Sequence, residues 1–243
     1  MVTQSKGKIF LAEERGLCEL DWFRTYNTFN FGQYYNEYKV PFGPLYVLNE
    51  DTLGGGKSMV MTMEDDSDII LLPVVGALDV SDGMGHTDSV EAGQALLLDM
   101  PKGASVDIRN PYETSLVKYL QLWMKKNPGK RGRALPRVLS FDLGGNPDRL
   151  IDLFSPTGSD TPDYTCAIGK FRGREETVYK IKGQGHGLFV FVIEGVFEVQ
   201  YRLLHAGDGL ALWDIQEAEL EALSNDAIIL LLELPLSLYL ERR

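Results

Sequence analysis

The chain has 243 residues, of which 44% are hydrophobic, and it carries a formal net charge of −11 at pH 7. This length predicts one or two domains, and the apolar content is sufficient to form a buried core. The net negative charge argues against broad nucleic-acid binding and against association with anionic membranes.

The two cysteines, Cys18 and Cys166, fit a reducing compartment, so we expect a cytoplasmic protein. The sequence leaves open whether these two cysteines form a disulfide. Residues 1–16 contain no apolar run of the length found in signal peptides. The apolar run at residues 228–232 is cut short by an acidic residue and a proline, so we expect no transmembrane helix.

Residues 21–49 are dense in aromatic side chains, which predicts a hydrophobic flap or edge that closes a barrel. From Gly54 to Trp123, short apolar runs rich in β-forming residues alternate with turn sequences such as Asp82-Gly83 and Ala92-Gly93. The runs are Ile69–Val75, Ala95–Leu98 and Leu116–Met124. Many short strands with closely spaced turns predict a β-barrel or sandwich.

A basic run with proline and glycine, residues 125–133, interrupts this otherwise acidic chain. We interpret it as a solvated linker, with a nuclear signal or a nucleic-acid arm as the alternatives. The linker predicts two domains, residues 1–130 and residues 131–243.

The second half repeats the first. Residues 195–199 (GVFEV) match residues 76–80 (GALDV), and residues 206–212 match residues 92–98. An apolar strand follows in each half, so we expect one barrel per repeat.

The aromatic segment has a characteristic order: Trp22-Phe23-Arg24-Thr25, Phe29, Phe31-Gly32, Tyr34-Tyr35, Phe42-Gly43-Pro44-Leu45 and Val47-Leu48-Asn49. With Gly54–Gly56, Gly76-Ala77-Leu78, Asp82–Gly85, Ala92-Gly93 and Gln121-Leu122-Trp123, it resembles pirin-like proteins of the cupin superfamily. Gly56, Thr62, Glu64, Asp68 and Gly76, followed by Pro101, Gly103, Val106 and Asn110, resemble the two cupin signature motifs.

The resemblance implies an all-β bicupin, that is, two cupin-type β-barrels in one chain. It also implies metal ligands, three histidines and one glutamate, at the positions occupied here by Thr62, Glu64, Val106 and Ile108. All three histidines are absent and the glutamate position holds isoleucine. We therefore expect no metal and no other cofactor.

Strand alternation predicts that Thr62 and Glu64 share one face of a strand. By the same rule, Val106 and Ile108 are expected beside them, so that these four line one cavity of the N-terminal barrel. With Asp68 at a polar wall, the cavity would suit a small amphipathic ligand.

The other candidate groups are weaker. His86, His186 and His205 lie in turns and are interpreted as surface or capping residues. The acidic run at residues 64–68 is interpreted as a solvated barrel mouth, with an oxygen-only Mg²⁺ or Ca²⁺ site as the alternative. Met59, Met61 and Met63 are expected on the opposite, packed face of the same strand.

The leading hypothesis is a metal-free, non-enzymatic protein that binds a small molecule in the N-terminal barrel or serves a regulatory role, with a protein partner left open. One alternative is a quercetinase-like dioxygenase with an atypical metal site on Glu64 and nearby carboxylates. Another is a redox sensor that acts through Cys18 or Cys166.

Overall fold

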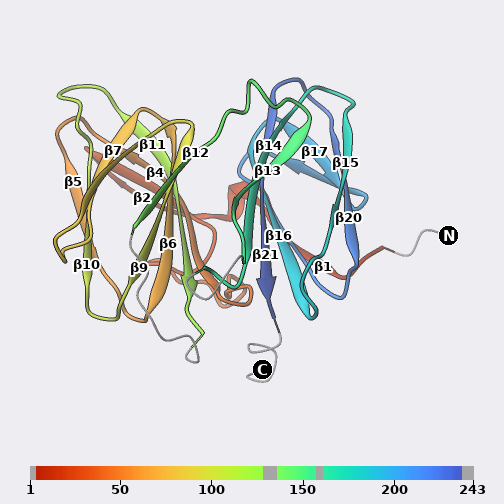
Figure 1. Ribbon diagram of the computed structural model, residues 1–243, viewed down its shortest axis with the longest axis horizontal. Helices are drawn as coiled ribbons and strands as arrows, with labels where there is room; N and C mark the ends of the chain where they lie inside the picture. Colours follow the sequence, from red (N-terminus) through yellow and green to blue (C-terminus); the bar gives the residue numbers. More distant parts are fainter. Residues whose placement is uncertain (1–3, 128–135, 157–160, 237–243) are drawn as a thin grey trace. The chain divides into compact units, whose positions relative to one another are not determined.

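The computed structural model describes residues 4–127, 136–156 and 161–236, which are almost entirely β-strands (Figure 1). Within these ranges the helical element is a short 3-10 helix, η1 (Ala12–Glu14). The predicted all-β fold with two barrels is therefore confirmed. No helix in the described ranges has the length and apolar character needed to cross a bilayer.

Two compact units make up the chain. The N-terminal unit comprises Gly16–Pro41 and Leu45–Phe141. The C-terminal unit comprises the described parts of Met1–Arg15, Phe42–Pro44 and Asp142–Arg243.

These units differ in three places from a single division after residue 130, and Phe42–Pro44, which belongs to the C-terminal unit, is one of them. Strand β1 (Gly7–Phe10) belongs to the C-terminal unit because it pairs antiparallel with β19 (Gly209–Leu212). Strand β12 (Arg137–Ser140) belongs to the N-terminal unit because it pairs with β9 (Gln94–Met100). Most of the expected linker, residues 128–133, lies outside the described residues.

Two sheets form the N-terminal unit, one in the order β12-β9-β6-β11-β4-β3-β2 and the other in the order β5-β10-β7-β8. Figure 1 shows β5 and β10 on one side of this unit and β6, β9 and β11 on the other. The remaining strands are β2 (Gly16–Leu20), β3 (Phe23–Asn27), β4 (Leu45–Leu53), β5 (Ser58–Thr62), β6 (Ser67–Val75), β7 (Ala77–Ser81), β8 (Thr87–Glu91), β10 (Ser105–Arg109) and β11 (Val117–Lys125).

Two sheets also form the C-terminal unit, in the orders β1-β19-β16-β21-β14-β13 and β15-β20-β17-β18. Its remaining strands are β13 (Arg149–Phe154), β14 (Thr165–Phe171), β15 (Glu176–Lys180), β16 (His186–Glu194), β17 (Val196–Val199), β18 (Arg202–His205), β20 (Glu217–Ala222) and β21 (Ala227–Pro235).

The topology of the two units repeats. The order β9-β6-β11-β4-β3 corresponds to β19-β16-β21-β14-β13, and β5-β10-β7-β8 corresponds to β15-β20-β17-β18. Gly76, between β6 and β7, has φ 81°, and its counterpart Gly195, between β16 and β17, has φ 80°. Glycine adopts this left-handed conformation without steric cost, which explains why both repeats carry it at the same turn.

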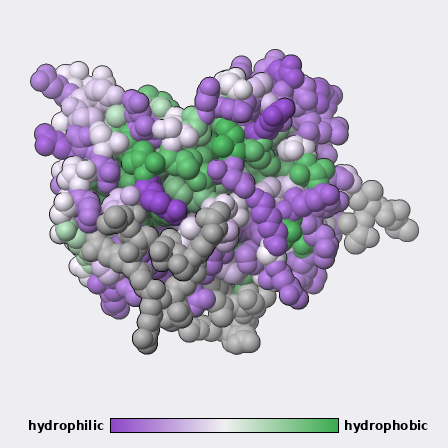
Figure 2. Space-filling model, in the orientation of Figure 1, coloured by the Kyte–Doolittle hydropathy of each residue, from purple (hydrophilic) through white to green (hydrophobic). Residues whose placement is uncertain are grey.

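Each unit has its own apolar core between its two sheets. Leu71 and Leu78 are examples in the N-terminal unit, as are Val190 and Phe197 in the C-terminal unit, and all four are almost fully buried. Burying one such side chain contributes about 1.5–3 kcal/mol. On the outer face of the C-terminal unit, β15 and β20 expose glutamates, and hydrophilic residues dominate this part of the surface in Figure 2.

The aromatic segment covers part of the N-terminal core. Phe31 packs edge-on against Trp123, with ring centroids 5.6 Å apart and planes at 88°. Trp22 also packs on this core, whereas Tyr35 and Tyr38 are exposed. The predicted flap role thus applies to part of the segment.

Candidate functional site

The inner face of β10 is apolar at the two positions matched to family metal ligands. Val106 and Ile108 are 0% exposed and belong to the core of the N-terminal unit. In the register with β5, Val106 lies opposite Met61 and Ile108 opposite Met59, and both methionines pack against the same core. This side of the strand pair therefore consists of hydrocarbon and thioether groups.

The other two predicted cavity residues lie elsewhere. Thr62 and Glu64 are exposed, and the Thr62 hydroxyl is 3.0 Å from that of Ser105, its cross-strand neighbour. Ser105 directly precedes the buried Val106, so Thr62 and Val106 belong to opposite faces of the sheet. The expectation that Thr62, Glu64, Val106 and Ile108 line one cavity is therefore corrected.

The phase of the pleat in β5 explains this difference. Met59 and Met61 turn inward from the strand, and Met63, just beyond it, is 2% exposed. Because residues two apart share a face, burying these three methionines turns Thr62 and Glu64 to solvent. The alternative phase would bury a carboxylate and expose three large apolar side chains, which is far less favourable.

The acidic run between β5 and β6 pairs with basic groups and the backbone. The carboxylate of Asp65 lies 2.6 Å from Lys125 Nζ, and the hydrogen bond from Lys125 lowers the pKa of Asp65. Asp66 Oδ1 accepts a 2.8 Å hydrogen bond from the N–H of Lys102, and Asp68 is half-buried in β6. Over the described ranges, no group of three or more His, Cys, Asp or Glu side chains is placed to hold a metal.

The residues at the implied metal position do not fit a transition-metal ion. Thr62 and Glu64 offer an exposed hydroxyl and an exposed carboxylate, and Val106 and Ile108 offer buried hydrocarbon. Iron, nickel and zinc sites in proteins need nitrogen, sulfur or oxygen donors converging on one point. These four side chains neither converge nor supply a donor from β10.

The two cysteines differ in environment. Cys166 is fully buried in β14, and burial, with a further contribution from the charge of Asp152, raises the pKa of its thiol far above the ordinary range. Since the thiolate is the reactive form, Cys166 is not a reactive thiol in the folded chain. Cys18 is exposed on β2.

A buried polar cluster crosses β3, β4 and β11 inside the N-terminal unit. Asp51 is 0% exposed, accepts a hydrogen bond from the Gln121 amide, and lies opposite Thr25 and Tyr119 in the strand register. Gln121 in turn accepts a 3.0 Å hydrogen bond from Trp123 Nε1. Burial raises the pKa of Asp51 to about 7, although the hydrogen-bonding groups of Thr25, Gln121 and Tyr119 oppose the rise.

A second buried carboxylate, Glu233, lies at one end of β21 in the C-terminal unit and is 1% exposed. It accepts hydrogen bonds from the Tyr179 hydroxyl at 2.9 Å and from the N–H groups of Lys182 at 3.0 Å and Gly183 at 2.6 Å. Its Oε1 also lies 2.9 Å from Nδ1 of His186. Burial, followed by the charge of Glu233, raises the pKa of Tyr179, so this phenol remains a donor.

The turn Gly183-Gln184-Gly185-His186-Gly187 positions the imidazole. A Cβ at Gly183 would lie 2.2 Å from the His186 ring, so only glycine leaves room for the ring to reach Glu233. With Nδ1 of His186 donating to the Glu233 carboxylate, Nε2 is the ring nitrogen left to interact with a ligand.

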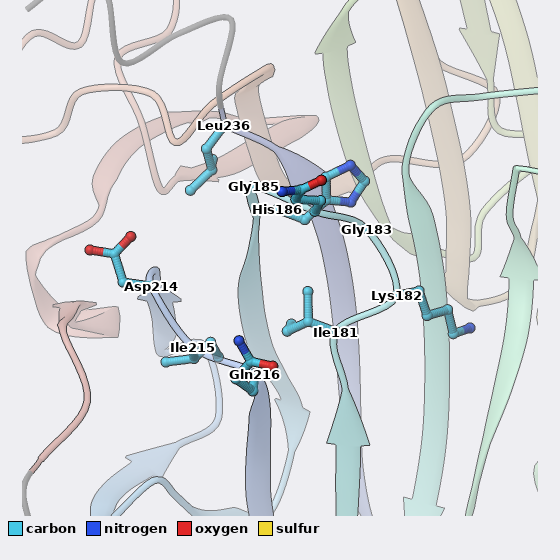
Figure 3. A pocket seen from close by; sticks show the side chains of 10 residues that line it. Ile181, Lys182, Gly183, Gly185, His186, Asp214, Ile215, Gln216 and Leu236 are labelled. Carbon is cyan, nitrogen blue, oxygen red and sulfur yellow. The ribbon is translucent and has the colours of Figure 1, made fainter.

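His186 borders a pocket of about 530 Å³ at this end of the C-terminal unit (Figure 3). Ile181, Ile215 and Leu236 supply apolar groups to its lining. Figure 3 shows the Lys182 side chain directed away from the pocket, and its Nζ lies 2.7 Å from Asp152. The volume is within the range of small-molecule sites.

Sequence reasoning missed the pairing of His186 with Glu233. His186 was interpreted as a surface or capping residue, but its side chain is only 18% exposed. The sequence did contain one indication of this pair, a glutamate inside the apolar run of β21. A carboxylate in a buried strand needs hydrogen-bonding partners. The other two histidines differ in position: His86 lies in a turn with its Nδ1 2.8 Å from Asp82, and His205 is the last residue of β18 and is largely exposed.

Comparisons with known proteins fit this architecture. Residues 161–234 match the family model described as the quercetinase C-terminal cupin domain. Quercetin 2,3-dioxygenase from Escherichia coli strain K12 is 26% identical over 229 residues, which are 92% of this chain and 96% of the relative. Pirin-like protein YhaK from the same strain is 27% identical over 133 residues, 55% of this chain and 57% of the relative. The crystal structure of YhhW from Escherichia coli has a TM-score of 0.81 at 23% identity and covers 95% of this chain and 98% of that one.

Proposed function

Because the chain is similar to a quercetin 2,3-dioxygenase and to a pirin-like protein, we propose that it is a pirin-like cupin protein that binds a small molecule or serves a regulatory role, uses no metal ion and lacks dioxygenase activity. One observation carries the proposal. Val106 and Ile108, at the positions where the resemblance implies a histidine and a glutamate, are 0% exposed within an apolar core. A metal at this point would have no donor from β10 and would lose its hydration without compensation.

The similarity to quercetin 2,3-dioxygenase from Escherichia coli favours a second candidate, a dioxygenase with an atypical metal site. The surroundings of the acidic run weigh against it. Asp65 is paired with Lys125, and Asp66 accepts a hydrogen bond from the backbone of Lys102. Glu64 is exposed and lies on the outer face, and Asp68 is half-buried in β6.

Two measurements on the purified protein test the proposal. Elemental analysis after dialysis should find well under one equivalent of iron, manganese, copper, nickel or zinc. Quercetin incubated with the protein and added Fe²⁺ should remain uncleaved, with the Escherichia coli quercetin 2,3-dioxygenase as the positive control. Stoichiometric metal, or Fe²⁺-dependent cleavage abolished by Glu64→Gln, would replace the proposal with the dioxygenase.

A further inference from the structure

The Glu233–His186 pair is not a requirement of the barrel architecture. His186 is the first residue of β16, and its counterpart Ser67 is the first residue of β6, each nine residues before the matched turn glycine. Glu233 is the seventh residue of β21, where β11 has Trp123. One barrel therefore folds with serine and tryptophan at the positions where the other has an acid–imidazole pair.

Burying Glu233 has a large desolvation cost, and the fold offsets it with a specific set of donors. The Tyr179 hydroxyl and two consecutive backbone N–H groups at Lys182 and Gly183 satisfy the carboxylate. Given those three donors, the additional bond to His186 chiefly fixes the orientation of the imidazole. Such a carboxylate behind a histidine is a common device for holding one ring nitrogen in a defined chemical state.

From this geometry we infer that the pocket beside His186 is a binding site for a small uncharged molecule with an apolar body and one weakly acidic hydroxyl group. The hydroxyl donates a hydrogen bond to Nε2 of His186, which has no partner within the described part of the chain. Ile181, Ile215 and Leu236 contact the apolar body. The inference rests on the proposed function and assigns it to this site.

The charges around the pocket favour a neutral donor over an anion. Two of the nearby carboxylates, Glu233 and Asp214, would repel a carboxylate ligand. The one lysine in the lining, Lys182, turns to Asp152, and Asp214 is itself 2.8 Å from Lys6 Nζ. Among the described residues that line the pocket, the ligand therefore meets an acceptor nitrogen, apolar side chains and the amides of Gln184 and Gln216, and the lysine is already paired.

The chain has only three histidines, so ¹⁵N-histidine labelling gives a spectrum with built-in references. The full-length protein is titrated with three probes of similar shape: 4-chlorophenol, chlorobenzene and 4-chlorobenzoate. We expect 4-chlorophenol, which is uncharged at neutral pH, to shift the Nε2 signal of His186 in a saturable manner and to leave His86 and His205 unchanged. Chlorobenzene, which has no donor, and 4-chlorobenzoate, which is anionic, should bind at least about tenfold more weakly, the equivalent of one hydrogen bond.

Two variants complete the test. His186→Gln should weaken 4-chlorophenol binding by about tenfold or more. The matched control is His86→Gln, because His86 forms a pair of the same type with Asp82 in a hairpin turn and is not among the lining residues. It should bind like the parent.

Equal binding of chlorobenzene and 4-chlorophenol, or unchanged binding in a folded His186→Gln protein, would overturn the inference. Neither result would restore a metal site, and metal content and quercetin cleavage are measured independently. Failure of this assignment is therefore distinguishable from failure of the proposed function.

Discussion

Asp51 makes the stability of the N-terminal unit depend on pH in a direction opposite to that of a paired surface carboxylate. Burial raises its pKa from an ordinary 3.8 to about 7, and the charge of the neighbouring Glu50 adds to the rise. Below pH 4 both the folded and the unfolded chain carry the proton. Between pH 4 and 7 the unfolded chain loses it and the folded chain retains it, so the free energy of unfolding falls as the pH rises.

The magnitude follows from the shift. One pKa unit corresponds to 1.36 kcal/mol, so a rise from 3.8 to about 7 corresponds to about 4 kcal/mol. This contribution is present below pH 4, decreases by up to about 1.4 kcal/mol per pH unit, and is lost above pH 7. Asp51→Asn keeps the shape of the protonated acid and removes the titration. The variant should therefore gain stability relative to the parent as the pH rises, by about 4 kcal/mol between pH 4 and 8.

Urea unfolding followed by tryptophan fluorescence measures this difference. In a Trp213→Phe background the remaining tryptophans, Trp22 and Trp123, both belong to the unit that contains Asp51. Asp65→Asn is the control, because Lys125 lowers the pKa of Asp65 and its contribution is lost as the pH falls. Parallel stability curves for the parent and Asp51→Asn from pH 4 to 8 would refute the assignment of a proton to Asp51.

Three further predictions follow from the burial of the N-terminal strand pair and of Cys166. Ile108→Ala should lower the free energy of unfolding by about 2–5 kcal/mol in urea melts, whereas Thr62→Ala, on the exposed face, should change it by about 0.5 kcal/mol or less. Met61→His combined with Val106→His places two imidazoles on facing inward positions, so Ni²⁺ should raise the melting temperature of this double variant. The control, Thr62→His with Val106→His, should show no such rise. An equal rise in both double variants would contradict the register. Cys166 should resist iodoacetamide in the folded protein at pH 8 and react after unfolding, as followed by mass spectrometry; rapid labelling without unfolding would contradict its burial.

The fold was readable from the sequence because its signals are local. Turn glycines and apolar runs mark strands at both repeats, and the matched pair Gly76 and Gly195 has nearly identical backbone conformation. The pairing of β1 with the C-terminal unit could not be predicted from the sequence. Gly7–Phe10 is a four-residue strand whose sequence does not indicate its partner, and that partner, β19, lies about 200 residues along the chain.

The candidate sites were harder to predict because they depend on register and on distant partners. From Met59 to Met63 a methionine occupies every second position, with Val60 and Thr62 between them and Glu64 next, so two phases are available and differ by one residue. The motif spacing favoured the phase with Thr62 inward, and the burial of three methionines selects the other. The donors to Glu233 come from residues 179–183, about fifty positions away, and two of them are backbone groups that leave no trace in side-chain identity.

The duplicated architecture separates what the fold requires from what each barrel adds. At the sheet positions of Asp51 and Tyr119, the C-terminal unit has Gly169 and Ile229, paired in the same register. Polar residues are therefore not needed to close this sheet. The two buried acids also differ in solvation: Glu233 has a donor at each oxygen, whereas Oδ1 of Asp51 has none in the described part of the structure. An oxygen without a donor leaves the ionised form of Asp51 less stabilised, in keeping with its raised pKa. The same barrel thus holds a carboxylate that orients an imidazole in one copy and a proton-binding group in the other.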